Sequence, residues 1–149
     1  MIYGIDPGFS GAIALYDPAT SFLEIHDMPI APGKNGKNQI LHSAVLDILS
    51  EPGKALIEQV AARPGQGVTS MFRFGQGYGA LEMACAASKL PLDYVTPRQW
   101  KAHFSLNGQK DVARGEASRQ FPEHAHLFKR KRDDGRAEAA LIALYGARQ

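Results

Sequence analysis

The sequence contains only one cysteine, Cys85, in 149 residues. A single cysteine cannot form an intramolecular disulfide, and it excludes cysteine-rich zinc sites. The sequence has no apolar run near the roughly 20 residues that span a bilayer. Residues 1–6 do not show the basic region and apolar stretch of a secretion signal. We therefore expect a cytoplasmic protein in which Cys85 is a reduced thiol within a helix of the core.

A strong excess of either charge is also missing, because 17 Lys and Arg stand against 15 Asp and Glu, a net charge of +2. The distribution is uneven. Residues 1–97 contain six basic and nine acidic side chains, whereas residues 98–149 contain eleven and six. A basic C-terminal part favours a polyanionic partner, although basic helices are often only solvated surfaces. Charge alone leaves both interpretations open.

The length and the 44% hydrophobic content predict one globular domain over residues 1–149. Apolar runs interrupted by Pro-Gly and Asp-Pro turns predict a three-stranded antiparallel meander over residues 2–28, and a flexible loop over 29–38. Helical and strand-like patterns then alternate, which predicts an α/β fold with two further, parallel strands and the first strand at the centre. We expect helices near 39–50, 70–88, 97–104, 110–120 and 137–145, strands near 55–60 and 92–95, and polar loops between them.

Several acidic residues occupy positions where a carboxylate is not expected unless it has a structural or functional role. Asp6 ends an apolar strand directly before a Pro-Gly turn, and Glu58 lies inside a predicted buried strand. Asp134 and Glu138 are four residues apart, so a helix would present both on one face, with Asp133 just before it. Each has an ordinary alternative: Asp6 as a turn acid, Glu58 paired with a basic side chain, Asp134 as a helix N-cap.

A single site for divalent cations would explain the positions of all these acids, because clustered carboxylates repel one another without positive charge. Ligands that are all oxygens suit Mg²⁺ or Mn²⁺. Two such ions about 3.5–4 Å apart can orient water and stabilise the leaving oxygen of a phosphodiester. The five histidines have no spacing typical of metal ligands. The sequence thus favours a two-ion oxygen site over histidine chemistry.

The motifs that carry these acids resemble those of RuvC-type Holliday junction resolvases, which have a ribonuclease-H-like fold. The resemblance covers nearly the whole chain in order. It includes Gly4-Ile5-Asp6-Pro7-Gly8, Leu56-Ile57-Glu58-Gln59-Val60, Phe74-Gly75-Gln76, Pro97-Arg98-Gln99-Trp100-Lys101 and Ala137-Glu138-Ala139-Ala140. The Pro-Gly-Gln-Gly loop and the Asp-Gly-Arg-Ala-Glu-Ala segment resemble the phage and prophage branch most.

The resemblance implies that Asp6, Glu58 and Glu138 are metal ligands. In the cellular enzymes the last two acting residues are three apart, but three residues before Glu138 stands Gly135. We therefore predict Asp134 as the fourth ligand, with Asp133 as the alternative. The resemblance also implies that Lys110 lies near the scissile phosphate and acts in catalysis.

Basic and polar residues around these acids are candidates for DNA contacts. Phosphate contacts give affinity and salt dependence without reading sequence. The loop after Glu58 resembles the junction-probing loop of the family but lacks its aromatic wedge. Phe72 or Phe74 could supply base stacking instead, although core packing is the simpler expectation for both, as it is for Trp100. The predicted DNA-contacting residues are Arg63, Gln66, Lys101, Lys110, Arg114, Lys129, Arg130, Lys131 and Arg132.

Together these features predict a homodimeric, Mg²⁺-dependent endonuclease that nicks four-way DNA junctions in pairs, because two active sites must reach two strands. A general debranching nuclease and an RNA-processing nuclease of the same fold remain alternatives. A kinase of the actin-like fold shares the Gly-Ile-Asp opening but needs a second domain, which 149 residues cannot supply. A catalytically inactive nucleic-acid-binding module is the alternative from a different class.

Overall fold

The main sheet of the molecule is mixed, with its first strand at the centre. The computed structural model describes residues 1–33, 36–62, 65–106 and 110–149. Within these ranges the sheet has five strands in the order β3-β2-β1-β6-β7. The first three form an antiparallel meander, and the last two run parallel to β1. The predicted sheet is confirmed, with β1 (Ile2–Asp6), β2 (Ala12–Asp17), β3 (Phe22–Asp27), β6 (Lys54–Glu58) and β7 (Leu92–Val95).

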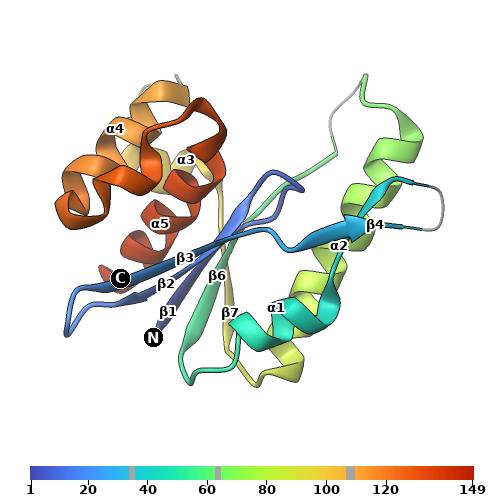
Figure 1. The fold of residues 1–149 in the computed structure, drawn as a ribbon, viewed down its shortest axis with the longest axis horizontal. Helices are drawn as coiled ribbons and strands as arrows, with labels where there is room; N and C mark the ends of the chain where they lie inside the picture. Colours follow the sequence, from blue (N-terminus) through green and yellow to red (C-terminus); the bar gives the residue numbers. More distant parts are fainter. Residues whose placement is uncertain (34–35, 63–64, 107–109) are drawn as a thin grey trace.

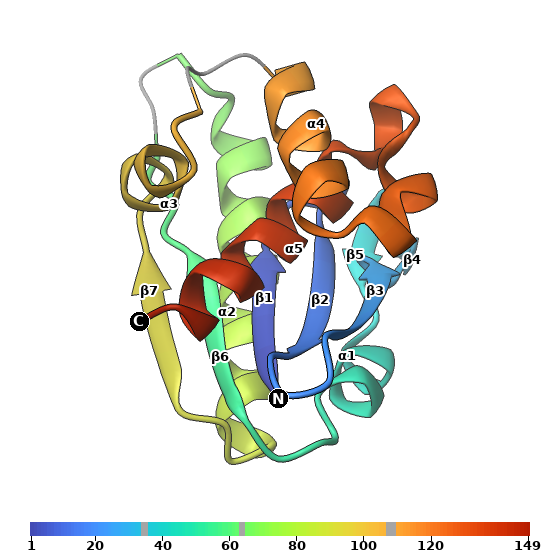
Figure 2. The same ribbon diagram turned by 90° about the vertical axis from the view of Figure 1, so that its left-hand side faces the viewer.

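Helices cover both faces of this sheet, so the molecule has three layers (Figure 1). One outer layer holds α1 (His42–Ile48) and α2 (Val68–Ala87), and the other holds α3 (Pro97–His103), α4 (Lys110–Gln120) and α5 (Asp134–Ala147). Seen from the side of α5, this helix crosses directly over β1 and β2 (Figure 2). The five predicted helices are thus confirmed. In the described ranges, none is long and apolar enough to cross a bilayer.

The alternation of strand residues divides the core into two halves. Tyr3 and Ile5 belong to the half beneath α1 and α2, whereas Gly4 contacts α5 on the opposite face. Because side chains of a strand alternate between faces, Asp6 shares the face of Gly4. In β6, Leu56 packs in the α5 half, so Glu58 faces the same way. Both strands therefore direct their terminal acids toward α5.

Two short strands lie in and next to the segment that the sequence predicts as a flexible loop over residues 29–38. Residues Ile30–Pro32 (β4) and Asn38–Ile40 (β5) form a two-stranded antiparallel sheet, and Ile30 lies opposite Ile40. The prediction was wrong because proline, glycine and lysine dominate the composition and conceal two very short strands. As a consequence the following helix starts at His42 rather than near residue 39.

The predicted polar loop between α4 and α5 contains two 3₁₀ helices, η1 (Pro122–Phe128) and η2 (Lys131–Asp133). Phe128 is buried in the α5 half of the core. Phe121, directly before η1, packs edge-to-face on Tyr16 with ring centroids 5.5 Å apart. These two aromatic anchors explain why a largely polar segment is held against the sheet.

Candidate metal centre

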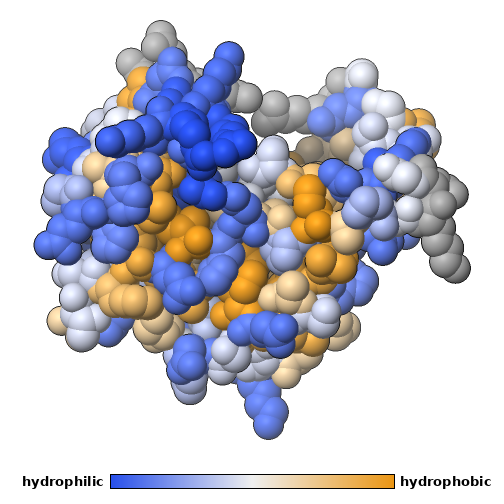
Figure 3. Space-filling model, viewed as in Figure 1, coloured by the Kyte–Doolittle hydropathy of each residue, from blue (hydrophilic) through white to orange (hydrophobic). Residues whose placement is uncertain are grey.

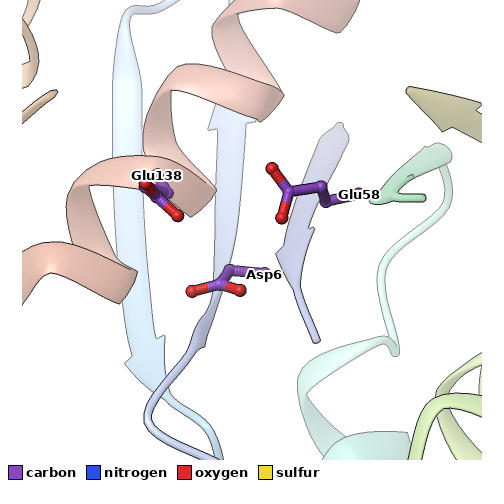
Figure 4. A group of neighbouring side chains, drawn as sticks. All are labelled: Asp6, Glu58 and Glu138. Carbon is purple, nitrogen blue, oxygen red and sulfur yellow. The ribbon is translucent and has the colours of Figure 1, made fainter. Parts of the chain in front are cut away.

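Three carboxylates meet above the carboxyl ends of β1 and β6. Asp6, Glu58 and Glu138 each offer one oxygen, and these oxygens all lie within 4.8 Å of one another. The three side chains point toward a common space from two strands and one helix (Figure 4). The convergence that the sequence could only suggest is therefore present in the structure.

The strand pairing brings the first two acids together. β1 and β6 are parallel neighbours, and their register places Ile5 beside Ile57. Asp6 and Glu58 each follow by one residue, at the same end of the sheet and on the same face. Neighbouring strands are only about 4.8 Å apart, so two carboxylates in this arrangement are necessarily close.

The third acid depends on an unusually close approach of α5 to the sheet. A Cβ atom on Gly4 would overlap the backbone of Ala139 and Ala143, so only glycine allows this contact. At the start of α5, a Cβ atom on Gly135 would overlap Ser10 and lie 2.8 Å from the Cα of Gly11. The glycine of the opening motif, Gly4, therefore sets the distance between the sheet and the helix that carries Glu138.

The carboxylate cluster changes the acidity of Asp6. Burial, followed by the negative charges of Glu138 and Glu58, raises the pKa of Asp6 to about 7. The backbone N–H of Gly8 and the charge of Lys101 oppose this rise. The local environment thus favours either a proton or a cation between these acids.

Helix α3 supplies a polar contact to each of the other two acids. The indole N–H of Trp100 donates a 2.9 Å hydrogen bond to Oε1 of Glu58. The ammonium of Lys101 lies 3.2 Å from Oε1 of Glu138. Trp100 is fully buried, which confirms its predicted place in the core. Its bond to Glu58 was not predicted, although a buried indole N–H and a buried acid both require partners.

Two acids that the sequence offered as a fourth ligand are held by arginines. Asp134 accepts a 2.8 Å hydrogen bond from Nε of Arg114. Asp133 is buried, and it accepts hydrogen bonds from the backbone N–H and the guanidinium of Arg130. Within the described residues, the group of three acids includes neither of them. The fourth ligand therefore stays a prediction.

Most of the predicted DNA-contacting residues belong to α3, to α4 or to the segment between α4 and α5. Lys129, Arg130, Lys131 and Arg132 are all exposed. Strongly hydrophilic surface gathers in the upper part of the view, in the region of α4 and of the segment before α5 (Figure 3). Arg114 is tied to Asp134 and Asp111.

Arg63 lies outside the described residues, and Lys110 is described only as the first residue of α4. Gln66 lines a groove of about 530 Å³ together with Phe9 and Phe74. Phe72 is 66% exposed, so the expectation that it packs in the core was wrong. An exposed position on α2 leaves Phe72 available for contact with another molecule.

The chemistry of the three acids fits a hard divalent cation. All the ligand atoms are carboxylate oxygens, the donors that Mg²⁺ and Mn²⁺ prefer. Burial and then mutual repulsion already destabilise the fully ionised cluster, as the raised pKa of Asp6 indicates. A bound cation would remove this repulsion. Asp6, Glu58 and Glu138 are therefore suited to hold such an ion.

The order of strands, the flanking helices and the acids at the sheet end define a ribonuclease-H-like α/β fold of the RuvC type. No family model matches the chain, and no curated sequence matches it either. Solved structures do. Thermus thermophilus RuvC is 19% identical, with a TM-score of 0.61 over 98% of this chain and 92% of that one.

Two further structures extend the likeness. Thermus thermophilus RuvC in complex with a Holliday junction substrate is 18% identical, with a TM-score of 0.61 over 98% of this chain and 92% of that one. The fowlpox virus Holliday junction resolvase is 18% identical, with a TM-score of 0.51 over 99% of this chain and 96% of that one. At such low identity the likeness establishes the fold.

Proposed function

We propose that the chain is a divalent-metal-dependent endonuclease that resolves Holliday junctions by paired nicks near the branch point. The observation that carries this proposal is the convergence of Asp6, Glu58 and Glu138 at one end of the sheet. The fold supports it, because one matched structure is a RuvC with a Holliday junction substrate and another is a viral Holliday junction resolvase.

The three acids would hold Mg²⁺ or Mn²⁺, two ions per site in this proposal, with Asp134 as the proposed fourth ligand. When bound, such ions activate water and stabilise the leaving oxygen of a phosphodiester. The chain itself orients the ligands: Trp100 holds Glu58 through a 2.9 Å hydrogen bond. Lys101, 3.2 Å from Glu138, places a positive charge where a phosphate would approach. Lys110, the first residue of α4, is the second lysine proposed to act near the scissile phosphate.

Substrate binding would rest on phosphate contacts from the basic C-terminal part. Lys129, Lys131 and Arg132 are exposed and lie directly before the acids of α5. We propose that the active form is a homodimer, because paired nicks on two strands require two active sites related by a two-fold axis. A cytoplasmic location and a place in the phage and prophage branch are parts of the same proposal.

The decisive experiment compares cleavage of a four-way junction, a fork, a linear DNA duplex and RNA by the purified chain with Mg²⁺. Symmetric paired nicks in the junction support resolution. Equal cutting of forks would indicate a debranching nuclease, and cutting of RNA alone would indicate an RNA-processing enzyme.

The variants Asp6→Asn and Glu58→Gln test whether cleavage depends on the acid cluster. Each removes a charged ligand, and a loss of about 4 kcal/mol of transition-state stabilisation corresponds to roughly 1,000-fold slower cleavage. Junction binding should survive in both variants. Asp47→Asn is the control, because Asp47 is an exposed acid on α1, in the opposite outer layer. If Asp6→Asn cleaves at the rate of the Asp47→Asn control, the site assignment is wrong.

A further inference from the structure

We infer that Trp100 is a positioning residue of the metal centre, whose indole N–H fixes the carboxylate of Glu58 in its ligand orientation before a cation binds. This inference rests on the proposed metal centre. It assigns a role to a residue that the sequence alone identifies only as part of the core.

The path of the chain leads Trp100 to Glu58. Val95 of β7 pairs with Glu58 of β6, and the N–H of Gln59 donates a 2.8 Å hydrogen bond to the carbonyl of Val95. A single residue, Thr96, then separates β7 from α3. The helix that carries Trp100 therefore begins beside the strand end that carries Glu58.

The first turn of α3 is fixed by its own sequence. Thr96 accepts a hydrogen bond from the backbone N–H of Gln99, and Oε1 of Gln99 accepts one from the backbone N–H of Thr96. Pro97 at the first helical position favours the same start. Trp100 follows at once, so a rigid cap determines where its indole lies.

The contact between the two side chains is short and fully enclosed. Trp100 has no exposed surface and Glu58 is 9% exposed. A hydrogen bond to an ionised acceptor is stronger than a neutral one, and in a buried setting a lost partner leaves an unsatisfied group. A free glutamate side chain loses rotamer freedom when it binds a metal, which weakens binding. A side chain that is already held in place has lost this freedom before the metal binds.

Partners of metal ligands affect affinity strongly. Their loss typically weakens metal binding 10- to 100-fold. Trp100 acts on the acid cluster from one side, while the Lys101 ammonium, 4.9 Å from the centre of the Trp100 ring, contacts Glu138. We expect removal of the indole N–H to weaken cation binding by a factor in that range.

The chain contains a single tryptophan, so replacing tryptophan during biosynthesis changes position 100 alone. A benzothienyl analogue, with sulfur in place of the N–H, keeps the shape of the side chain and removes the donor. As the matched rescue, 5-fluorotryptophan keeps the donor and alters the ring. Trp100→Phe is a second, genetic form of the same change.

The control for loss of hydrogen bonds by a core side chain is Tyr3→Phe. The hydroxyl of Tyr3 donates to the carbonyl of Glu51 and accepts from its N–H, in the core half away from the acids. This variant loses two part-buried hydrogen bonds without touching Glu58. Any change that follows from general destabilisation should appear in it as well.

The experiment is titration of the full chain with Mn²⁺ by calorimetry in the absence of DNA, with thermal unfolding with and without Mn²⁺ as a second readout. We expect a Kd raised 10- to 100-fold in the benzothienyl protein and in Trp100→Phe, and the wild-type Kd in the 5-fluorotryptophan protein and in Tyr3→Phe. The rise in Tm on adding Mn²⁺ should shrink in the same two proteins.

An unchanged Kd in the benzothienyl protein would overturn the inference, even if its Tm without metal is lower, because Trp100 would then be only structural. Absence of Mn²⁺ binding in the wild type would overturn it too. Because no DNA is present, the result is separate from the nuclease proposal. A chain whose Mn²⁺ affinity depends on the Trp100 indole N–H but that cuts no branched DNA would retain this inference and lose the proposed function.

Discussion

The Nε atom of Arg114 lies 2.8 Å from Oδ1 of Asp134, one helical turn before Glu138 on α5. The same guanidinium also bonds to Asp111 and to the carbonyl of Lys129. Asp134 is therefore held by α4 on the side of α5 near Glu138. The pair of Arg114 and Asp134 thus connects α4 to the acid that the sequence favours as a fourth ligand.

The variants Asp134→Asn and Asp133→Asn should separate the two candidate acids. With Asp134 as the fourth ligand, Asp134→Asn weakens Mn²⁺ binding and slows cleavage, while stability changes little. Asp133→Asn removes a buried carboxylate that Arg130 holds, which should cost about 2 kcal/mol of unfolding free energy. Calorimetry and urea unfolding measure the two effects. Reversal of the pattern would make Asp133 the ligand.

The raised pKa of Asp6 predicts a stability that depends on pH when metal is absent. Its ordinary value is 3.8, and burial with the charges of Glu138 and Glu58 raises the pKa to about 7. Between these values the folded chain holds a proton that the unfolded chain has lost, so stability falls as pH rises. From pH 5 to pH 8 the loss should be about 2 to 3 kcal/mol.

Urea unfolding of the wild type and of Asp6→Asn, both with EDTA, measures this contribution as the difference between their pH profiles. Groups that titrate independently of Asp6 cancel in the comparison. Saturating Mg²⁺ should flatten the wild-type profile, because the cation stabilises the ionised acid. Parallel profiles for the two proteins would show that Asp6 is an ordinary, solvated carboxyl group.

Gly4→Ala tests the close contact between β1 and α5. The added methyl group would overlap the backbone of Ala139 and Ala143, and overpacking of this kind typically costs about 1–3 kcal/mol. Cleavage should fall further than stability alone explains, since Glu138 moves with the helix. Gly79→Ala is the control: nothing lies within 4 Å of its added Cβ, and alanine favours the α2 helix by about 1 kcal/mol. Circular dichroism melting and junction cleavage compare the two, and equal behaviour would contradict the proposed role of Gly4.

Simultaneous replacement of Lys129, Lys131 and Arg132 by alanine should weaken junction binding. Each lost phosphate contact reduces the slope of log K against log salt by about 0.9. Arg130 stays in place because it holds Asp133. Arg119→Ala, an exposed arginine on α4 paired with Glu116, is the control and should keep the wild-type slope. A salt titration of binding with inactive Glu58→Gln protein as background gives the slopes; an unaltered slope in the triple variant would remove these residues from the interface.

Much of the fold was predictable because its signals are local. The Pro-Gly turn after Asp6 and the short apolar runs define the meander, and Thr96-Pro97 defines the start of α3. Repeated apolar spacing likewise predicts α2 and α5. The strands β4 and β5 were missed because each has three residues, too few for an alternating pattern to emerge.

The candidate site was predictable as a set of residues but not as a geometry. Asp6, Glu58 and Glu138 attract notice because acids in apolar strands and helices are costly. The bond from Trp100 to Glu58 joins residues 42 positions apart, and it depends on the pairing of β6 with β7. Phe72 shows the opposite failure, because core packing is the simpler expectation for an aromatic residue in this helix, yet its side chain is 66% exposed.

The placement of Glu138 on the last helix also ties the chemistry to the order in which the chain is made. The two strand acids emerge early during synthesis, but they lack their third partner until α5 docks against Gly4. An unfinished chain would thus carry Asp6 and Glu58 without the third acid of the candidate cation site. The cation site that the proposed function requires would therefore form only when α5 packs against the sheet.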